Sequence, residues 1–175
     1  MKIKLSILCA AMLVSATVFA QPQAIKKGYR ANMGVSFMNC TTKGLVGSSI
    51  FAETVHGYSD GKGTFIGLGT GLGYSLVNDD AYIPIYLKVK YNFNADKNYS
   101  PYASLRAGGL FNTSTDFEEN SLVISSGVGF DFSRFSVELS YVFNEGKARS
   151  VPMLARDYWT YFKAGYLSAG FFYNF

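Results

Sequence analysis

Charged side chains interrupt several segments of the sequence in which apolar residues recur at every second position. If these segments are strands of one closed sheet, the charges face its interior, where an unpaired charge is costly. We therefore expect a network of ion pairs in which Glu138 pairs with Arg106 or Lys88. A gated or narrow path for ions or small solutes is the alternative. The candidate residues are Arg30, Glu53, Lys88, Arg106, Asp131 and Glu138.

His56 is the only histidine, the residue type best suited to proton transfer near neutral pH. With a serine and a carboxylate it would fit a lipid-modifying enzyme of the acyltransferase or deacylase type. Such sites work near the outer rim of a barrel, whereas the strand pattern described below places His56 at the opposite end. We therefore expect an interface or turn role for His56, no catalytic residues and no enzymatic activity.

Four glycines alternate with other residues from Gly67 to Gly73, and the run superficially resembles a phosphate-binding loop. It lacks the G-x-G-x-x-G spacing, and no helical pattern follows it. On a strand these glycines line one face, where they leave room for large side chains such as Arg106 or Tyr86. We expect no nucleotide, no metal and no other cofactor.

The elements that position these residues are strands, because the chain after residue 20 alternates with a period of two and has little helical periodicity. In the clearest segment, Val137 and Leu139 share one face while Ser136 and Glu138 share the other. We predict strands at 27–38, 46–57, 62–75, 81–93, 99–111, 120–132, 134–144 and 161–175.

The orientation of the two faces decides between a soluble and a membrane barrel. A lipocalin-like barrel or a sandwich would alternate with its apolar face inward. Here charges, glycines and serines occupy the middle of the polar face, and the apolar faces end in tyrosine and phenylalanine. An apolar outer band between aromatic girdles, around a polar interior, is typical of a barrel in lipid. We predict an all-β fold, an eight-stranded antiparallel up-and-down transmembrane β-barrel whose narrow lumen is filled by side chains.

The connections between the predicted strands fall into two classes. With a periplasmic N-terminal end, the outward connections lie near 39–45, 76–80, 112–119 and 145–160. The periplasmic turns lie near 58–61, 94–98 and Ser133. Short periplasmic turns and longer surface loops are usual in such barrels. Because proline cannot donate a ladder hydrogen bond, we expect Pro84 at the outer rim and Pro101 at the inner rim.

Aromatic and charged residues near the longest loop suggest contacts with the outer leaflet. Tyr158, Trp159 and Tyr161 are assigned to the aromatic belt at the outer interface, with a binding patch on the loop as the alternative. The loop charges are expected to be solvated. The alternatives are contacts with lipopolysaccharide phosphates and a weak divalent-cation site. The residues concerned are Lys147, Arg149 and Arg156 for the first and Asp116, Glu118 and Glu119 for the second.

The N-terminal segment has the features of a secretory signal peptide. Lys2 and Lys4 precede an uncharged apolar stretch, 5–19, that ends in a small-x-small site. This stretch is shorter than the roughly 20 residues that a spanning helix needs. We predict a cleaved signal peptide at 1–20 and one β-barrel domain at 21–175.

Cleavage also changes the charge and the cysteine content. Loss of Lys2 and Lys4 lowers the formal net charge from +4 to +2, which is not the footprint of a nucleic-acid-binding protein. Loss of Cys9 leaves Cys40 alone, so no internal disulfide can form.

The last residues match the spacing of the outer-membrane assembly signal, with a polar residue, a glycine, an apolar residue and a terminal aromatic. These are Ser168, Gly170, Tyr173 and Phe175. Such a signal would act by strand addition to the insertion machinery. An amphipathic strand that happens to end in phenylalanine is the alternative.

Several short segments, in a fixed order, resemble a known family. They are Gly28-Tyr29-Arg30, Thr54-Val55-His56-Gly57-Tyr58, 65–74, Ile83-Pro84-Ile85-Tyr86, Ser100-Pro101-Tyr102 and the final strand. The chain resembles the outer-membrane protein β-barrel domain family, small OmpX- or OmpA-like barrels common in Bacteroides-group bacteria. The resemblance implies a barrel in the outer membrane, and it supplies no catalytic residues because most members have no assigned activity.

The sequence thus favours a small integral barrel of the bacterial outer membrane, without enzymatic activity, that serves envelope structure or surface interaction. A narrow transport pore is the second interpretation and a lipid-modifying enzyme the third. The expected partners are outer-membrane lipids and lipopolysaccharide, and the barrel-assembly machinery during insertion. We expect a monomer that binds no nucleic acid.

Overall fold

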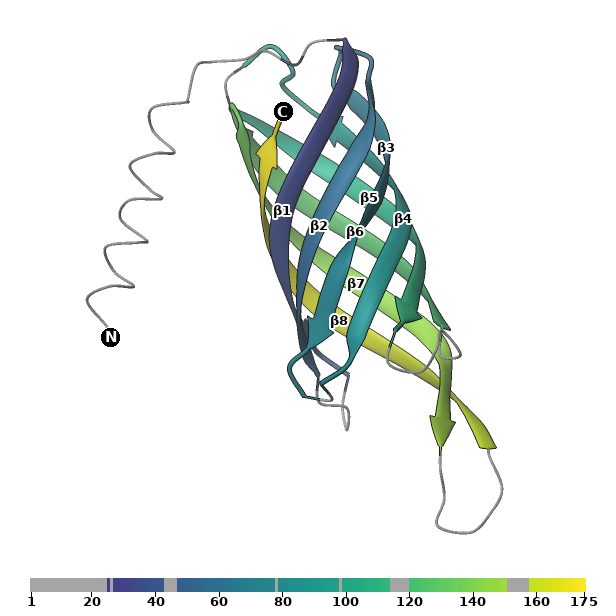
Figure 1. Ribbon diagram of the computed structural model, residues 1–175. Coiled ribbons are helices and arrows are strands. Elements are labelled where there is room, and N and C mark those ends of the chain that lie inside the picture. The colour runs from purple at the N-terminus through teal and green to yellow at the C-terminus, as the bar shows by residue number, and fades with distance from the viewer. Residues whose placement is uncertain are drawn as a thin grey trace, which may run out of the picture.

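Eight antiparallel strands close into one barrel in the computed structural model, each strand pairing with its neighbours in chain order and β8 with β1 (Figure 1). The structure describes residues 25, 27–42, 47–77, 79–97, 99–113, 120–150 and 158–175, with the backbone alone at 147–150 and 158–160. The predicted signal peptide, the acidic residues Asp116, Glu118 and Glu119, and Arg156 lie outside the described residues. In the described part of the chain, no helix is long and apolar enough to cross a membrane.

The predicted fold class is confirmed, and the strand bounds of the first six strands agree with the prediction to within two residues. The strands are β1 (Gly28–Cys40), β2 (Ser48–Ser59), β3 (Thr64–Ser75), β4 (Ala81–Asn92), β5 (Tyr99–Asn112), β6 (Asn120–Phe132), β7 (Phe135–Ser150) and β8 (Tyr158–Asn174). Closure is made by β1 and β8, whose pairing runs from Asn32 opposite Asn174 to Cys40 opposite Tyr166.

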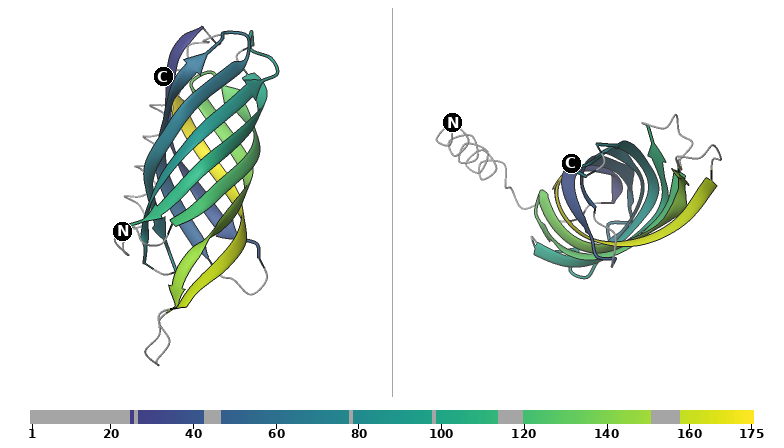
Figure 2. Two further views of the ribbon diagram at one scale, coloured as in Figure 1. Left: turned by 90° about the vertical axis from the view of Figure 1, so that its right-hand side faces the viewer. Right: turned by 90° about the horizontal axis from the view of Figure 1, so that it is seen from below.

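The two ends of the barrel differ. At one end, which we call the termini end, β1 begins and β8 ends, and the connections are tight (Figures 1 and 2). The opposite end, the loop end, carries the connections that follow β1, β3, β5 and β7. This is the division into short turns and longer loops that the sequence predicted.

Backbone chemistry accounts for the tight turns. In the turn after β2, the backbone N–H groups of Lys62 and Thr64 donate to Asp60 Oδ1 at 2.7 and 2.9 Å. The hydrogen bond from Lys62 holds the pKa of the Asp60 carboxyl below its usual value. Gly61 and Gly63 follow with φ of 73° and 120°, a region that favours glycine.

The last hairpin departs from the prediction. The segment 145–160 was expected to be a loop, but β7 continues to Ser150 and β8 starts at Tyr158. The ladder persists through the pairing of Glu145 with Lys163, whose side chains form an ion pair at 3.2 Å. Lys147 and Arg149, expected on the loop, therefore lie on β7. The two strands project beyond the rest of the barrel (Figure 1).

The inside and outside of the barrel are inverted relative to a soluble protein. Val137 and Leu139 face outward with 40% and 51% of their surface exposed, whereas Glu138 between them faces inward with 5%. The buried apolar cluster is small and consists of Val55, Phe65 and Tyr86. The predicted orientation of the two faces is therefore correct.

Both strand prolines lie close to strand ends, as expected. Pro84 is near the start of β4 at the loop end, and Pro101 is near the start of β5 at the termini end. Pairing between β3 and β4 passes from Thr70 opposite Ile85 directly to Gly73 opposite Tyr82. A gap there is consistent with the missing N–H of Pro84.

Candidate functional site

Glu138 on β7 lies at the centre of the charges inside the barrel. Lys88 Nζ donates to Glu138 Oε2 at 2.8 Å, and Arg106 Nη2 donates to Glu138 Oε1. The hydroxyl of Tyr102 donates to Oε2 at 3.1 Å. Both partners proposed from the sequence thus contact this carboxylate, and they reach it from β4 and β5 across the lumen.

Glu53 on β2 accepts hydrogen bonds from the other side of the same guanidinium. Arg106 Nη1 lies 3.0 and 3.1 Å from the two oxygens of Glu53. The hydroxyls of Tyr86 and Ser36 also donate to this carboxylate. Apolar and polar residues alternate only weakly along β2, so the sequence indicates the inward orientation of Glu53 less clearly than that of the other charges. With Lys88 and Arg106 opposite Glu53 and Glu138, the group is electrically balanced.

A second ion pair lies nearer the termini end. Lys90 Nζ donates to Asp131 Oδ1 at 2.6 Å. Asn92 Nδ2 and Ser136 Oγ also donate to this carboxylate, at 2.6 and 2.7 Å. Lys90 was absent from the predicted network, although it follows Lys88 at the strand period of two and so had to face the same side.

Aromatic rings fill the space between the charged groups. Lys90 Nζ lies 4.0 Å from the ring centroid of Tyr102, and Lys88 Nζ lies 4.9 Å from that of Phe172. Cations over aromatic faces gain from the ring quadrupole, more so where water is absent. We call this assembly the plug. It consists of Glu53, Tyr86, Lys88, Lys90, Tyr102, Arg106, Asp131, Glu138 and Phe172.

The alternating glycines of β3 make room for the plug. Gly67, Gly69, Gly71 and Gly73 all face inward. A Cβ at Gly69 would collide with the ring of Tyr86. The glycines therefore act as the space-making face that the sequence suggested.

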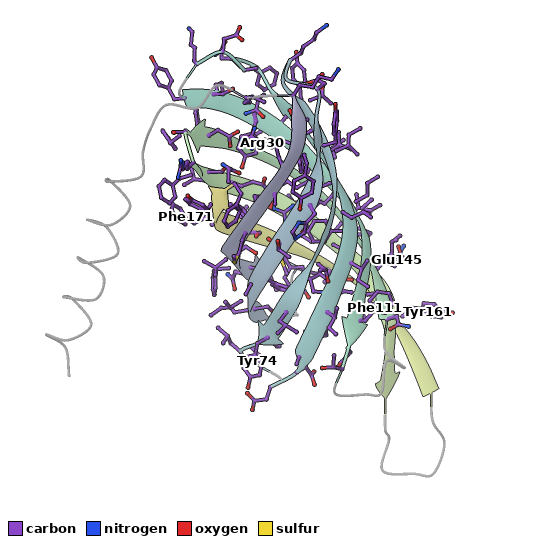
Figure 3. The ribbon with its side chains drawn as sticks, turned by 45° about the horizontal axis from the view of Figure 1, so that its top comes forward. Arg30, Tyr74, Phe111, Glu145, Tyr161 and Phe171 are labelled. Atoms are coloured by element: carbon purple, nitrogen blue, oxygen red, sulfur yellow. The ribbon has the colours of Figure 1, made fainter. Side chains whose placement is uncertain are left out.

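Arg30 lies apart from the plug. It is on the inward face of β1 at the termini end, where it is partly exposed (Figure 3). Its charge interacts with the carboxylate of Asp131 rather than with Glu53 or Glu138. Of the six predicted network residues, the structure brings together Glu53, Lys88, Arg106 and Glu138 in one cluster and Asp131 in the neighbouring pair.

A cavity of about 390 Å³ occupies the lumen on the loop-end side of the plug. Its floor includes Glu53, Tyr86 and Arg106, and it reaches the strand ends at Cys40 and Asn120. We call it the vestibule. The sequence predicted a filled lumen, which describes the plug but not this half of the barrel.

His56 lies on the outer face of β2, so its side chain points away from the lumen and the plug. The hydroxyl of Tyr29 lies 2.5 Å from Nδ1, and Thr54 Oγ1 lies 3.0 Å from Nε2. Thr54 Oγ1 in turn donates to the backbone carbonyl of Asn32 at 3.1 Å. Because the Thr54 hydroxyl donates to this carbonyl, its oxygen accepts from the Nε2–H group of the ring. Among the described residues, no group of three His, Cys, Asp or Glu side chains could hold a metal.

Exposed aromatic side chains surround the termini end of the barrel. They come from six strands and their ends: Tyr29, Tyr58, Tyr91, Phe93, Tyr99, Phe130, Phe132, Phe171 and Phe175. The residues assigned to the outer belt lie at the loop end. Tyr158, Trp159 and Tyr161 lie on β8 beyond its last pair with β1, and Tyr161 is exposed on the projecting hairpin (Figure 3).

The residues of the predicted assembly signal lie on the strand that closes the barrel. Ser168 and Gly170 face inward, and the exposed ring of Phe175 follows the end of β8. The ring of Tyr173 packs edge-on against that of Phe175, with centroids 4.9 Å apart.

Comparison with known proteins is informative at the level of structure. No protein-family model and no curated protein matches the sequence. A designed transmembrane β-barrel superposes with a TM-score of 0.57 at 14% identity, over 89% of this chain and 100% of the design. Neisserial surface protein A superposes with a TM-score of 0.51 at 13% identity, over 85% of this chain and 97% of that protein. The Ail protein of Yersinia pestis gives 0.46 at 14% identity, over 86% and 99%. At such identities the likeness concerns fold: this chain is a closed up-and-down barrel similar to those of membrane proteins.

Proposed function

We propose that the protein is a small integral β-barrel of the bacterial outer membrane, non-enzymatic and closed to ion flow, which contributes to envelope structure and displays surface loops. The observation that carries this proposal is the inverted distribution of polarity. Leu68, Leu72 and Leu105 are between 60% and 67% exposed, whereas Lys88 and Glu138 are buried. An exposed apolar surface of this extent would aggregate in water and is stable in lipid.

The orientation follows from the two ends of the barrel. The aromatic girdle and the tight turns lie at the termini end, which we assign to the periplasm. The loop end, with the vestibule, then faces the outside. The N-terminal signal peptide, cleaved after Ala20, would deliver the chain to the periplasm.

The plug supports a closed barrel. Side chains from β2, β4, β5, β6, β7 and β8 meet across the lumen, and each charged group among them is paired with an opposite charge. Eight-stranded barrels have an interior that side chains can just fill. The contacts of His56 are with hydroxyl groups on the outer surface, which supports a role in the membrane interface rather than in lipid hydrolysis.

We place the chain among the small OmpX-like barrels of the Bacteroides-group type. Its partners would be outer-membrane lipids and lipopolysaccharide, and the assembly machinery would bind the strand that ends in Phe175. Deletion of Phe175 should lower the amount of inserted barrel without lowering export, because the signal peptide is untouched. Equal insertion of the deletion variant would remove the assembly role.

The location and fold can be tested together. Expressed with its signal peptide in a Gram-negative host, the protein should sediment with the outer membrane and begin at Gln21. Unboiled and boiled samples should migrate differently on a gel, as closed barrels do. A protein that remains soluble without detergent would contradict the proposal.

Cys40 provides a test of orientation, because it is the one cysteine of the mature chain and lies at the loop end. A membrane-impermeant maleimide should label it on intact cells. In the matched control, Cys40→Ser with Lys62→Cys, the thiol moves to the turn at the termini end and should be labelled only after the outer membrane is permeabilised. The reverse pattern would invert the barrel.

Planar-bilayer recordings address conduction. The purified barrel should show no steady channels, because the paired charges of the plug close the path. Stable open channels from the unmodified protein would favour the narrow transport pore instead.

A further inference from the structure

We propose that the vestibule is a binding site for a small neutral molecule rich in hydroxyl groups, of the size of a mono- or disaccharide. The proposal goes beyond the structural role above and concerns the interior of the barrel alone. Its volume of about 390 Å³ lies within the range of small-molecule sites in proteins.

Two residues that line the vestibule each carry a buried polar atom without a hydrogen-bond partner among the described residues. Asn144 is 7% exposed, and its Oδ1 atom has no hydrogen-bond partner among the described residues. The same holds for Nε of Arg106, in the floor. Buried polar atoms usually have partners. Asn144 Oδ1 accepts and Arg106 Nε donates, so a hydroxyl group, which can do both, complements these atoms once a small side-chain movement opens them to the cavity.

The charge of the floor favours a neutral ligand. The guanidinium of Arg106 contacts the carboxylates of Glu53 and Glu138, and Lys88 balances the second of these. An anion would have to compete with two carboxylates for Arg106, and a cation would face its positive charge. Neither has an unpaired counter-charge at the floor, and the further charged residue of the lining, Asp80, lies at the loop-end rim beside Tyr82.

The remaining wall combines rings with short polar side chains. Phe51 and Tyr86 present aromatic surface, while Ser125 and Ser168 contribute hydroxyls from β6 and β8. A ligand with apolar C–H faces and hydroxyl edges suits such a wall better than an acyl chain, which would leave the serines and Asn144 unpaired.

Calorimetric titration of the refolded full-length mature barrel tests the inference. The detergent should be a zwitterionic amine oxide, because a sugar-headed detergent would compete. The probes are glucose, maltose, lactose and trehalose, with octanoate and inorganic phosphate as apolar and anionic comparisons. We expect saturable binding of at least one sugar, which should also slow maleimide labelling of Cys40 in the vestibule wall.

Two variants locate the site. Asn144→Leu is nearly isosteric and should raise the dissociation constant roughly tenfold, because the ligand loses a buried hydrogen bond. The matched control is Asn32→Leu. Asn32 is also 7% exposed with an unpartnered Oδ1, but it does not line the vestibule, so binding should be unchanged. Ser125→Phe should fill the vestibule and abolish binding.

Three results would overturn the inference. The first is the absence of saturable binding for every sugar tested. The second is sugar binding that Asn144→Leu and Ser125→Phe leave unchanged, which would move the site elsewhere. The third is saturation by octanoate or phosphate in preference to the sugars, which would assign the vestibule to another class of ligand. Gel mobility of each variant before and after boiling establishes that it is folded.

Discussion

The plug and the vestibule occupy the same barrel, between the same strands, yet one is filled and the other hollow. Along β7, the inward residues of the filled half include Ser136 and Glu138, whereas those of the hollow half are Val142 and Asn144. Along β5, Arg106 reaches across the lumen, while Asn112 stays at the wall of the vestibule. At constant strand number, the set of inward side chains that meet at one level decides whether that part of a narrow barrel is filled or hollow.

The two halves also differ in how their polar groups are satisfied. In the plug, each carboxylate accepts at least three hydrogen bonds from residues on other strands. In the vestibule, Asn144 Oδ1 has none among the described residues. The carboxylates of the plug therefore stabilise the barrel, whereas Asn144 Oδ1 makes no hydrogen bond to a described residue that could do so.

The largest effect is expected from removing the centre of the plug. Glu138→Ala leaves Lys88 and Arg106 buried without one of their counter-charges, and it should lower the free energy of unfolding by about 3–5 kcal/mol. Urea titration in lipid vesicles, followed by gel mobility, measures the change. Glu138→Gln, which keeps the size and a hydrogen-bond acceptor, should be milder. A loss below about 1 kcal/mol for the alanine variant would show that the ion pairs of the plug do not depend on Glu138 for their stability.

A smaller loss is expected at the edge of the plug. Lys90→Met removes the ion pair with Asp131 but leaves the hydrogen bonds from Asn92 and Ser136 in place. We expect the free energy of unfolding to fall by about 2–3 kcal/mol in the same urea titration, because the carboxylate stays partly satisfied. A loss as large as that of Glu138→Ala would mean that the two ion pairs form a single cooperative unit.

The filled and hollow halves of the barrel should also differ in how much space they leave for a larger side chain. Gly69→Leu places a side chain against the ring of Tyr86 and should cost about 1–3 kcal/mol, because the filled half has no space to accommodate it. The matched control is Ser125→Leu, which projects into the vestibule and should change stability by less than about 0.5 kcal/mol. Equal losses at the two positions, measured in urea, would show that the vestibule is as tightly packed as the plug.

Much of the fold could be predicted from the sequence, because a period of two fixes the face of every residue in a strand. The inward positions of Lys88 and Glu138 follow from alternation alone, and so does the position of Lys90. From the sequence, the partner of Glu138 could only be narrowed to two candidates, Arg106 and Lys88. These candidates come from strands across the lumen, and both contact it, because a carboxylate can accept several hydrogen bonds.

Two features depend on information that alternation does not contain. The vestibule depends on which inward side chains lie at the same height along the barrel axis. The register and tilt of the strands set that height, and residue type does not. The extension of the last hairpin was missed because Glu145, Gly146 and Lys147 resemble a loop in composition. Their pairing with 161–163 continues the ladder, and cross-strand attraction between Glu145 and Lys163 favours it.

The smallest effect on stability is expected at Asn144, and it tests whether this polar side chain serves folding or ligand binding. Asn144→Leu removes a buried carbonyl without a described partner, and an apolar side chain of similar size takes its place. The free energy of unfolding should therefore stay the same or rise by up to about 1 kcal/mol in urea. A loss above about 1 kcal/mol would mean that Asn144 satisfies a group in the barrel itself. Unchanged stability with weakened sugar binding would instead mean that the asparagine serves the vestibule, because a residue kept for folding could not be exchanged so cheaply.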